Sequence, residues 1–179
     1  MSSERSKGFT LAEILLAVAI AAIIAGVVLP MLSSQDSKKL EVAARETGNA
    51  LRFAVNEARR TGSYVLVDAK TAAGRLRVVK SDAGGANLGA VNDPLSKQAL
   101  DIDTAGSPFS GPVSMTPRFM RGGTAYAQML ISPAAQLQAF DGPAANMGAL
   151  EPGSGIVLAL GARTVTVSIN ESTGFVAIP

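Results

Sequence analysis

The hydrophobic pattern begins with an apolar run over residues 9–32 that contains one charged residue, Glu13. Thr10, Gly26 and Pro30 are its other departures from Ile, Leu, Val, Ala, Met and Phe. A helix needs about 20 predominantly apolar residues to cross a bilayer, and this run has that length. An acidic side chain at the centre of a membrane helix costs on the order of 2.5–3.5 kcal/mol. The run therefore predicts a transmembrane helix in which Glu13 has a function.

A second helical pattern continues over residues 33–62 after a short polar stretch. Its apolar stripe follows spacings of four and three and consists of Leu40, Ala44, Thr47, Leu51, Ala54 and Ala58. This spacing puts the stripe on one face of a helix whose other face carries charges of both signs. Gly62 is a natural C-terminal end for this helix. We expect one helix over residues 9–61, packed against a sheet of the same chain, with self-dimerisation as a coiled coil as the alternative.

Several later segments have the composition of β-strands. Residues 64–68 and 75–80 predict a hairpin. Residues 156–160 form an apolar run, residues 163–169 alternate strictly between Thr or Ser and Val or Ile, and residues 175–178 close the chain. Together these three segments predict a C-terminal antiparallel meander.

The periodic spacing of apolar and polar residues becomes weaker over residues 81–155, which are rich in Gly, Ala, Pro, Asn and Ser. We expect a loop-rich middle with short strands at 113–115 and 125–131. Such loops carry partner contacts or are flexible insertions, and the sequence leaves both open. With this middle, residues 63–179 predict one β-rich globular domain, and the fold class is α+β: a long N-terminal helix against a C-terminal antiparallel β-sheet domain.

Composition argues against an enzyme. The 179 residues contain no His and no Cys, so the commonest base, the thiol nucleophile and the usual transition-metal ligands are missing. Asp101 and Asp103 alternate, but two carboxylates fall short of the six to eight oxygens that calcium takes. We read them as a polar loop and predict no catalytic, cofactor or metal site. The net charge of +2 does not indicate a polyanion-binding chain.

The start of the apolar run resembles a known processing signal. Lys7-Gly8-Phe9-Thr10-Leu11-Ala12-Glu13, behind a leader that includes Arg5, resembles the type III signal of type IV pilins and type II secretion pseudopilins. The resemblance implies that a prepilin peptidase cuts after Gly8, removing residues 1–8, and that Phe9 is N-methylated. It also implies that Glu13 neutralises the terminal amine of a neighbouring subunit during assembly, and that Pro30 kinks the helix.

Physical reasoning agrees with this assignment. Cleavage would leave an ammonium on Phe9 in or near hydrocarbon, where a charge needs a partner. Glu13 is nearby, about 6 Å along a helix that rises about 1.5 Å per residue. Gly8 presents no side chain to an approaching peptidase. A secretory signal peptide has a shorter apolar core of about 7–15 residues, and a plain anchor leaves Glu13 unexplained.

A second resemblance narrows the family. Residues 50–62 and the following Tyr64-Val65-Leu66-Val67 resemble the helix end and first strand shared by H-type minor pseudopilins and FimT-type minor pilins, and Thr173-Gly174-Phe175-Val176 resembles their last hairpin. The H-type resemblance implies a minor pseudopilin near the tip of the periplasmic pseudopilus of a type II secretion system, which exports folded proteins across the outer membrane. Its implied partners are other minor and major pseudopilins and the inner-membrane assembly platform. The implied location is the bacterial inner membrane, single-pass, with the C-terminal domain in the periplasm.

The alternative is a FimT-like minor pilin that binds DNA for uptake. Phosphate binding requires clustered Lys or Arg. Arg118 and Arg121 could form a small patch with Phe119 and Tyr126, but residues 173–179 contain no basic residue, unlike the basic hairpin of FimT-like binders. Nucleic acid is therefore not an expected partner. A major fibre subunit is a further alternative, disfavoured by the expected loop-rich middle.

Overall fold

A computed structural model describes residues 10–71, 73–94, 96–106 and 112–178, and within these it leaves out the side chains of residues 25–34. The predicted cleavage and methylation at Gly8 and Phe9 lie outside the described residues. So does the side chain of Pro30, where a kink was predicted. The chain divides into two compact units, Met1–Ser37 and Lys38–Pro179, which are described separately.

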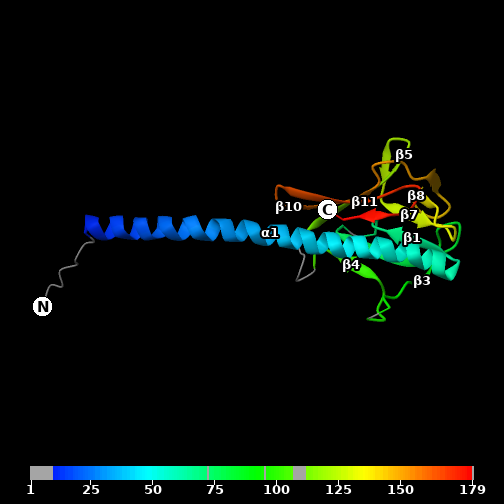
Figure 1. The fold of residues 1–179 in the computed structure, drawn as a ribbon, viewed down its shortest axis with the longest axis horizontal. Coiled ribbons are helices and arrows are strands. Elements are labelled where there is room, and N and C mark those ends of the chain that lie inside the picture. Colours follow the sequence, from blue (N-terminus) through cyan, green and yellow to red (C-terminus); the bar gives the residue numbers. More distant parts are fainter. Residues whose placement is uncertain (1–9, 72, 95, 107–111, 179) are drawn as a thin grey trace, which may run out of the picture. The chain divides into compact units, whose positions relative to one another are not determined.

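Helix α1, Leu11–Thr61, runs from the first unit into the second (Figure 1). It ends where the sequence predicts, because Gly62 adopts a φ of 61°, a left-handed conformation that suits glycine after the last helical turn. Arg59 and Arg60 lie in the last turn, where cations interact favourably with the negative end of the helix dipole.

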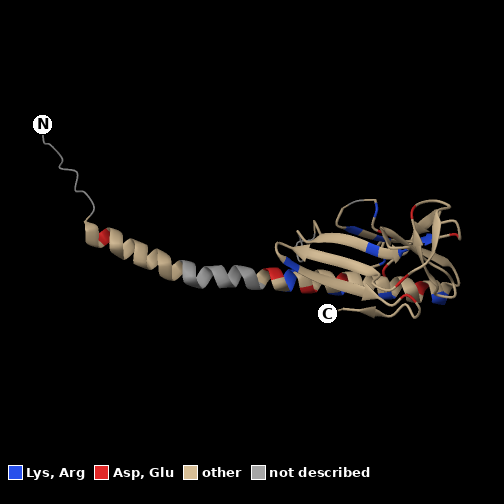
Figure 2. Cartoon of the chain, turned by 90° about the horizontal axis from the view of Figure 1, so that it is seen from above, with Lys and Arg blue, Asp and Glu red and all other residues tan. Residues whose placement is uncertain are grey.

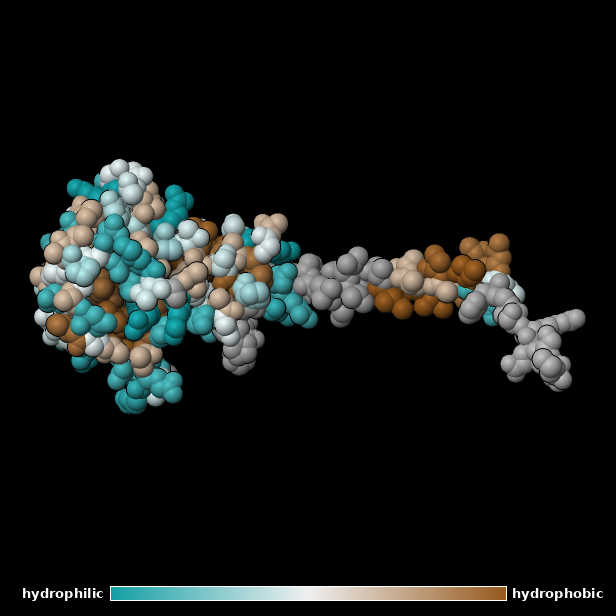
Figure 3. Space-filling model, turned by 180° about the vertical axis from the view of Figure 1, so that it is seen from behind, coloured by the Kyte–Doolittle hydropathy of each residue, from teal (hydrophilic) through white to brown (hydrophobic). Residues whose placement is uncertain are grey.

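In the first unit, the described side chains of residues 11–24 are all exposed and nearly all apolar (Figure 3). The large ones are Leu11, Ile14, Leu15, Leu16, Val18, Ile20, Ile23 and Ile24, with exposed fractions between 49% and 76%. They point to every side of the helix, in contrast to the one-sided stripe expected of a helix that packs on a sheet. Across the described residues, no helix combines the length and apolarity needed to cross a membrane.

In the second unit, α1 buries the predicted stripe completely. All six predicted positions are at most 2% exposed: Leu40, Ala44, Thr47, Leu51, Ala54 and Ala58. Ala43, Ala50 and Val55 widen the buried face. The prediction that this half of the helix packs within its own chain is confirmed, because the apolar residues of this face share one core cluster with residues of the strands. Small alanines let the helix lie close to the sheets.

The larger sheet is antiparallel and starts from the predicted hairpin of β1, Tyr64–Asp68, and β2, Arg75–Ser81. In the described residues its order is β3-β2-β1-β7-β8-β9, and β4 also pairs with β2. The other strands are β3, Asn87–Ala90; β4, Asp101–Asp103; β7, Gln128–Ile131; β8, Leu137–Phe140; and β9, Asn146–Ala149.

The smaller sheet contains the predicted C-terminal meander. Strands β10, Gly155–Leu160, β11, Arg163–Ile169, and β12, Val176–Ala177, pair antiparallel in chain order, which confirms the prediction. On β11, Val167 and Ile169 are buried while the Thr and Ser side chains are exposed. Strands β5, Ser114–Arg121, and β6, Thr124–Tyr126, extend this sheet beyond β10.

Alternation along β1 explains how the larger sheet buries both faces. Val65 and Val67 belong to the main core with α1, whereas Leu66 points to a second cluster with Val79, Leu130 and Phe140. Successive side chains of a strand point to opposite faces, so a continuous apolar run such as β1 is expected where both faces are covered. The N-terminal helix and the antiparallel sheets give the predicted α+β fold.

The middle of the chain contains more strand than its sequence pattern predicted. The described residues between 81 and 155 include seven strands, β3 to β9, where short strands at 113–115 and 125–131 were expected. Most are only three or four residues long, which leaves too few alternating positions for a recognisable pattern. Gly89 in β3 and Gly148 in β9 have φ values of 131° and 103°. A glycine weakens a strand, so its presence in a short segment argues against predicting a strand there.

Candidate assembly site at the helix N-terminus

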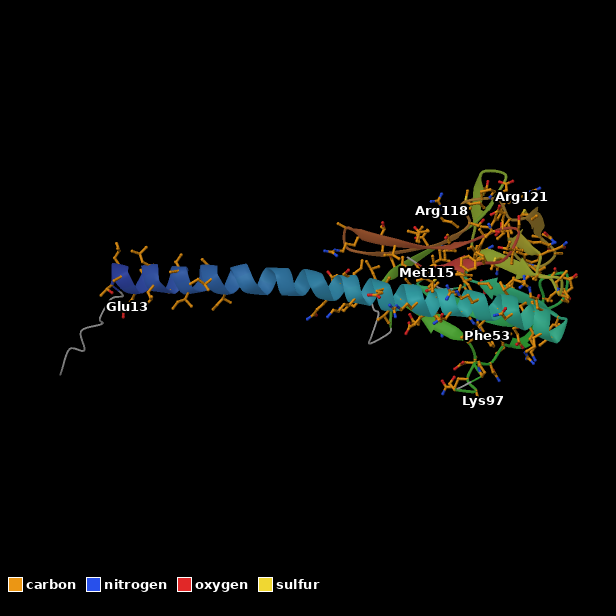
Figure 4. All side chains as sticks on the ribbon, viewed as in Figure 1. Glu13, Phe53, Lys97, Met115, Arg118 and Arg121 are labelled. Atoms are coloured by element: carbon orange, nitrogen blue, oxygen red, sulfur yellow. The ribbon has the colours of Figure 1, made fainter. Side chains whose placement is uncertain are left out.

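Glu13 lies in the first turn of α1 and closes a capping box with Thr10 (Figure 4). The Thr10 backbone N–H donates to Glu13 Oε2 at 2.9 Å, and the Thr10 hydroxyl donates to the same oxygen at 3.0 Å. The Glu13 backbone N–H lies 3.3 Å from Thr10 Oγ1 and 3.1 Å from the Thr10 carbonyl oxygen. Both residues thus satisfy backbone groups that a helix N-terminus leaves without partners.

This arrangement gives Glu13 a local role that sequence reasoning missed. The signal was present, because Thr-x-x-Glu ahead of an apolar run is typical of a capping box. Both side-chain bonds use Oε2, and within the described residues Oε1 receives no hydrogen bond. A carboxylate can accept on both oxygens. The cap therefore holds the carboxylate at the start of the helix and leaves one oxygen for another donor.

A second site joins α1 to the end of the chain. Arg52 donates from Nη2 to the Val176 carbonyl oxygen at 2.8 Å and from Nε to the same oxygen at 3.2 Å. Arg59 donates from Nη2 to the Thr173 carbonyl oxygen at 3.1 Å. Gly48 allows Ile178 to approach the helix, since a Cβ at Gly48 would lie 2.5 Å from Ile178 Cδ1. Sequence reasoning missed these residues, because nothing local in a helix shows which carbonyls will face it.

The arginine patch considered for the DNA-binding alternative would lie on β5 and β6. Phe119 is fully buried and belongs to the core, so it offers no aromatic surface. Arg118 and Arg121 are three residues apart on one strand and therefore point to opposite faces, which Figure 4 also shows. Arg121 Nη1 lies 3.5 Å from Glu151 Oε1 and donates to the Ala149 carbonyl oxygen at 3.3 Å. The structure therefore does not bring these residues together into the small patch that the DNA-binding alternative would need.

Asp101 and Asp103 form strand β4 and have separate structural roles, which corrects their reading as a loop. Asp101 pairs with Arg75 across the sheet, with 2.7 Å between Arg75 Nη2 and Asp101 Oδ2. Asp103 Oδ1 accepts from the backbone N–H groups of Ala105 and Gly106 at 3.0 and 2.8 Å. Each carboxylate is thus committed to its own neighbours.

Asp68, at the end of β1, is the hub of a polar network. Its carboxylate accepts hydrogen bonds from the Thr71 hydroxyl, the Lys70 backbone N–H and the Gln128 side chain. Partial burial raises the pKa of Asp68, but these hydrogen bonds and the charge of Arg77 outweigh burial and hold the pKa below its usual range. The charged form is therefore part of the folded state.

Comparison with known proteins found a match for the N-terminal part of the chain. Residues 4–29 match the prokaryotic N-terminal methylation motif. No curated protein and no solved structure matches the chain. The motif is of the prepilin type, so it supports a type IV pilin-like protein with a membrane-anchored N-terminus. It implies processing by a prepilin peptidase and assembly with other pilins.

Proposed function

We propose that the chain is a minor pseudopilin of a type II secretion system. It acts as a structural subunit near the tip of the periplasmic pseudopilus and assists export of folded proteins across the outer membrane. The observation that carries the proposal is Glu13, held at the first turn of an otherwise apolar helix segment and lying within the prepilin-type motif matched over residues 4–29. The sequence resemblance of residues 50–67 is common to H-type pseudopilins and FimT-type minor pilins, and what favours secretion over DNA uptake is that residues 173–179 contain no basic residue.

The two units would have different tasks in this role. The run over residues 9–32 would hold the precursor in the inner membrane as a single pass and later line the fibre core, with Pro30 kinking it there. The exposed apolar side chains of residues 11–24 support this, since they offer surface to lipid or to neighbouring helices. Lys38–Pro179 would lie in the periplasm, where it would meet other minor and major pseudopilins, while the assembly platform acts at the membrane.

The capping box suggests how Glu13 serves assembly. After cleavage behind Gly8, the methylated amine of Phe9 on a neighbouring subunit would be a cation that needs a carboxylate partner. Glu13 Oε1 could accept from that amine while Oε2 keeps its bonds to Thr10. The carboxylate would then not have to give up the helix cap in order to pair. This places capping and neutralisation on different oxygens of one residue.

The proposal is for a structural role and not a catalytic one, with no cofactor. It also favours secretion over DNA uptake. Arg118 and Arg121 lie on opposite faces of β5, and Arg121 is paired with Glu151, so these residues do not form the clustered positive surface that phosphate binding needs. Figure 2 shows Lys and Arg interspersed with Asp and Glu over the second unit.

Three variants of the full-length chain, co-expressed with a prepilin peptidase, test processing and assembly. Gly8→Val should leave the precursor uncut, as read from the size of the chain. Glu13→Gln should be cut, because the amide oxygen can still accept from Thr10, but it should be lost from fibres for lack of charge. Thr10→Ala, the matched control, removes the cap partner and keeps the carboxylate, so it should be incorporated. Cleaved Gly8→Val, or Glu13→Gln that enters fibres normally, would contradict the assignments.

Copurification of the same full-length chain separates the two systems. The tagged chain is solubilised in detergent and tested in parallel against candidate minor pseudopilins and against duplex DNA, each at low and high salt. Retention of pseudopilins without DNA supports the secretion proposal. Retention of DNA at low salt that is lost at high salt would overturn it in favour of uptake, because phosphate contacts weaken steeply with salt.

A further inference from the structure

The larger sheet contains two three-stranded meanders of the same construction. Its order, β3-β2-β1-β7-β8-β9, places β1-β2-β3 on one side and β7-β8-β9 on the other, and the two meet where β1 pairs with β7 (Figure 1). We call them the β1 meander and the β7 meander. At the seam Leu66 lies opposite Leu130, so the antiparallel pair has a local two-fold axis between these residues. Strand β4 is an addition to the β1 meander at β2.

The two meanders have the same register. A residue of β2 or β3 corresponds to the residue 59 positions later in β8 or β9: Lys80 pairs with Gly89, and Ala139 pairs with Gly148. Both ladders then shift register at the equivalent step, directly after Lys80 and directly after Ala139. A register shift leaves a residue unpaired and bends the strand locally, so its position is a specific feature of a sheet. Its occurrence at corresponding residues indicates that the two meanders have one plan.

Residues beyond the paired strands continue the correspondence. The Val91 N–H donates to the Val78 carbonyl oxygen at 3.2 Å, and the Leu150 N–H donates to the Leu137 carbonyl oxygen at 3.0 Å. Val91 and Leu150 are both buried in the main core with α1. Backbone bonding and burial thus agree outside the strands as well as within them.

The correspondence is also visible in the sequence. Residues 82–91 read Asp-Ala-Gly-Gly-Ala-Asn-Leu-Gly-Ala-Val, and residues 141–150 read Asp-Gly-Pro-Ala-Ala-Asn-Met-Gly-Ala-Leu. Five of the ten positions are identical. The shared Asn and Gly form the same hydrogen bond, because the Gly89 N–H donates to Asn87 Oδ1 at 2.9 Å and the Gly148 N–H donates to Asn146 Oδ1 at 2.8 Å. The identities therefore fall on residues that the sheet makes equivalent.

The turns of the two meanders meet over the second cluster, on the outer face of the sheet. These turns are residues 82–86 and 141–145, and the Ala144 N–H donates to the Gly84 carbonyl oxygen at 2.7 Å. Gly85 packs on the ring of Phe140, where an added Cβ would overlap Cε1. Gly85 and Ala144 are corresponding residues, and both are left-handed, with φ values of 78° and 61°. This conformation suits glycine and disfavours alanine.

We infer that the β1 and β7 meanders are two copies of one structural unit, and that their turns form a two-part clasp that keeps the second cluster covered. The repeat explains why Ala144 is left-handed: the unit requires this conformation at that position, and the β1 meander supplies a glycine there. The clasp explains why Phe140 is 0% exposed on the outer face. Opening it would uncover an apolar patch formed by Leu66, Val79, Leu130 and Phe140. Neither the repeat nor the clasp depends on a role in secretion.

Exchange of whole segments between the meanders tests the repeat, in the full-length chain in mild detergent. Replacing residues 141–150 by the sequence of residues 82–91 should keep the urea midpoint within about 1 M of the natural chain, since each side chain enters an equivalent place. The same ten residues in scrambled order, the matched control, should lower the midpoint several times as much. The reverse replacement puts alanine beside Phe140 and should be unstable until Gly85 is restored. Equal losses for the ordered and scrambled segments would overturn the repeat.

Single exchanges test the backbone correspondence. Ala144→Gly brings in the glycine of the β1 meander and should raise the urea midpoint by roughly 0.2–0.5 M, because it relieves a left-handed alanine. Ala83→Gly is the matched control, since it brings in the glycine found at the corresponding position 142. The φ of Ala83 is not positive, so this change should leave the midpoint unchanged or lower it slightly. A gain for Ala83→Gly alone would contradict the correspondence.

Cysteine accessibility tests the clasp, since the natural chain contains no cysteine. Val79→Cys reports on the second cluster, and Val78→Cys, its neighbour on the opposite face, reports on the main core. Adding Gly85→Ala, which forces the turn away from Phe140, should speed maleimide labelling of the Val79→Cys chain about tenfold and leave the Val78→Cys chain unchanged. Ala144→Gly, which relieves the clasp, should slow labelling of the Val79→Cys chain. Equal acceleration at both positions, or no acceleration at position 79, would overturn the clasp.

Discussion

The two halves of α1 treat apolar side chains in opposite ways. Over residues 11–24 the large apolar side chains are exposed on all sides, with Leu15 at 61%. Over residues 38–61 most apolar side chains gather on one face and are buried, with Leu51 at 0%. Both stretches have the same backbone conformation. The difference lies in periodicity, which decides whether the partner of an apolar surface is found inside the chain or outside it.

This comparison shows where the stability of the second unit comes from. Isolated helices gain little from propensity alone, so the second half depends on its tertiary packing against the strands. The large apolar side chains described in the first half are exposed, and under the proposed function their partners would be lipid or other subunits. A mutation of the same type should therefore have very different effects in the two halves.

The largest expected effect comes from truncating one leucine in each half. Leu51→Ala removes a fully buried side chain and should lower the free energy of unfolding by about 2–5 kcal/mol through lost burial and a residual cavity. Leu15→Ala, the matched control, should change it by less than about 0.5 kcal/mol, because its side chain is exposed. Urea denaturation of the full chain in mild detergent measures both. Equal losses would show that the first half is also packed within the chain.

A smaller effect of opposite sign is expected at Thr47. Its side chain is 0% exposed, and its Oγ1 has no hydrogen-bond partner among the described residues. Thr47→Val replaces the hydroxyl by a methyl group of similar size and similar helix propensity. The free energy of unfolding should rise by about 1 kcal/mol, since an unsatisfied buried hydroxyl is costly. Thr47→Ser retains the hydroxyl and should show no gain, and a loss for Thr47→Val would indicate a partner for the hydroxyl.

The smallest expected effect is the dependence of the stability of the second unit on acidic pH. The pKa of Asp68 is lowered in the folded state, so its contribution to stability is present above its unfolded pKa of about 3.9 and is lost as pH falls through the folded value. The urea midpoint followed from neutral to acidic pH should fall less steeply for Asp68→Asn than for the natural chain.

Glu46 provides the matched control for this pH series. Burial raises the pKa of Glu46, so its charged form disfavours folding, and stability from this group increases as pH falls through that raised pKa. Glu46→Gln should therefore stabilise the chain slightly at neutral pH and leave the acid-induced loss in place. If the loss of stability at acidic pH disappears in Glu46→Gln and persists in Asp68→Asn, then Glu46 and not Asp68 is responsible for it.

The sequence predicted those elements whose pattern is long enough to repeat. The stripe from Leu40 to Ala58 spans five turns and the alternation of β11 spans seven residues, so both were recognisable. Strands β4 and β9 were not recognisable from the sequence. They have only three and four residues, which include two acids in β4 and a glycine in β9, so they show no alternation of apolar and polar positions.

Some residues of the candidate sites were also predictable from the sequence and others were not. The motif around Gly8 and Glu13 is local, so residue types and spacing were enough to find it. The hydrogen bonds of Arg52 and Arg59 to the C-terminal turn depend on contacts between distant segments, which one sequence does not reveal. The burial of Phe119 was missed for the same reason, since its partners come from other strands.

The bond from Arg52 to the Val176 carbonyl oxygen is one of several contacts that this protein can make only after its last residues have been synthesised. The two residues are 124 positions apart, and Val167 and Val176 belong to the same core as the helix stripe. Closing so long a stretch of chain is slow, and although β1 and β2 follow the helix directly, the core that covers the apolar stripe of α1 is incomplete until the last strands have left the ribosome. A newly made chain therefore carries an incompletely covered amphipathic helix while the roughly 120 residues after Ala58 are made, and we expect a chaperone to bind it until its final residues are in place.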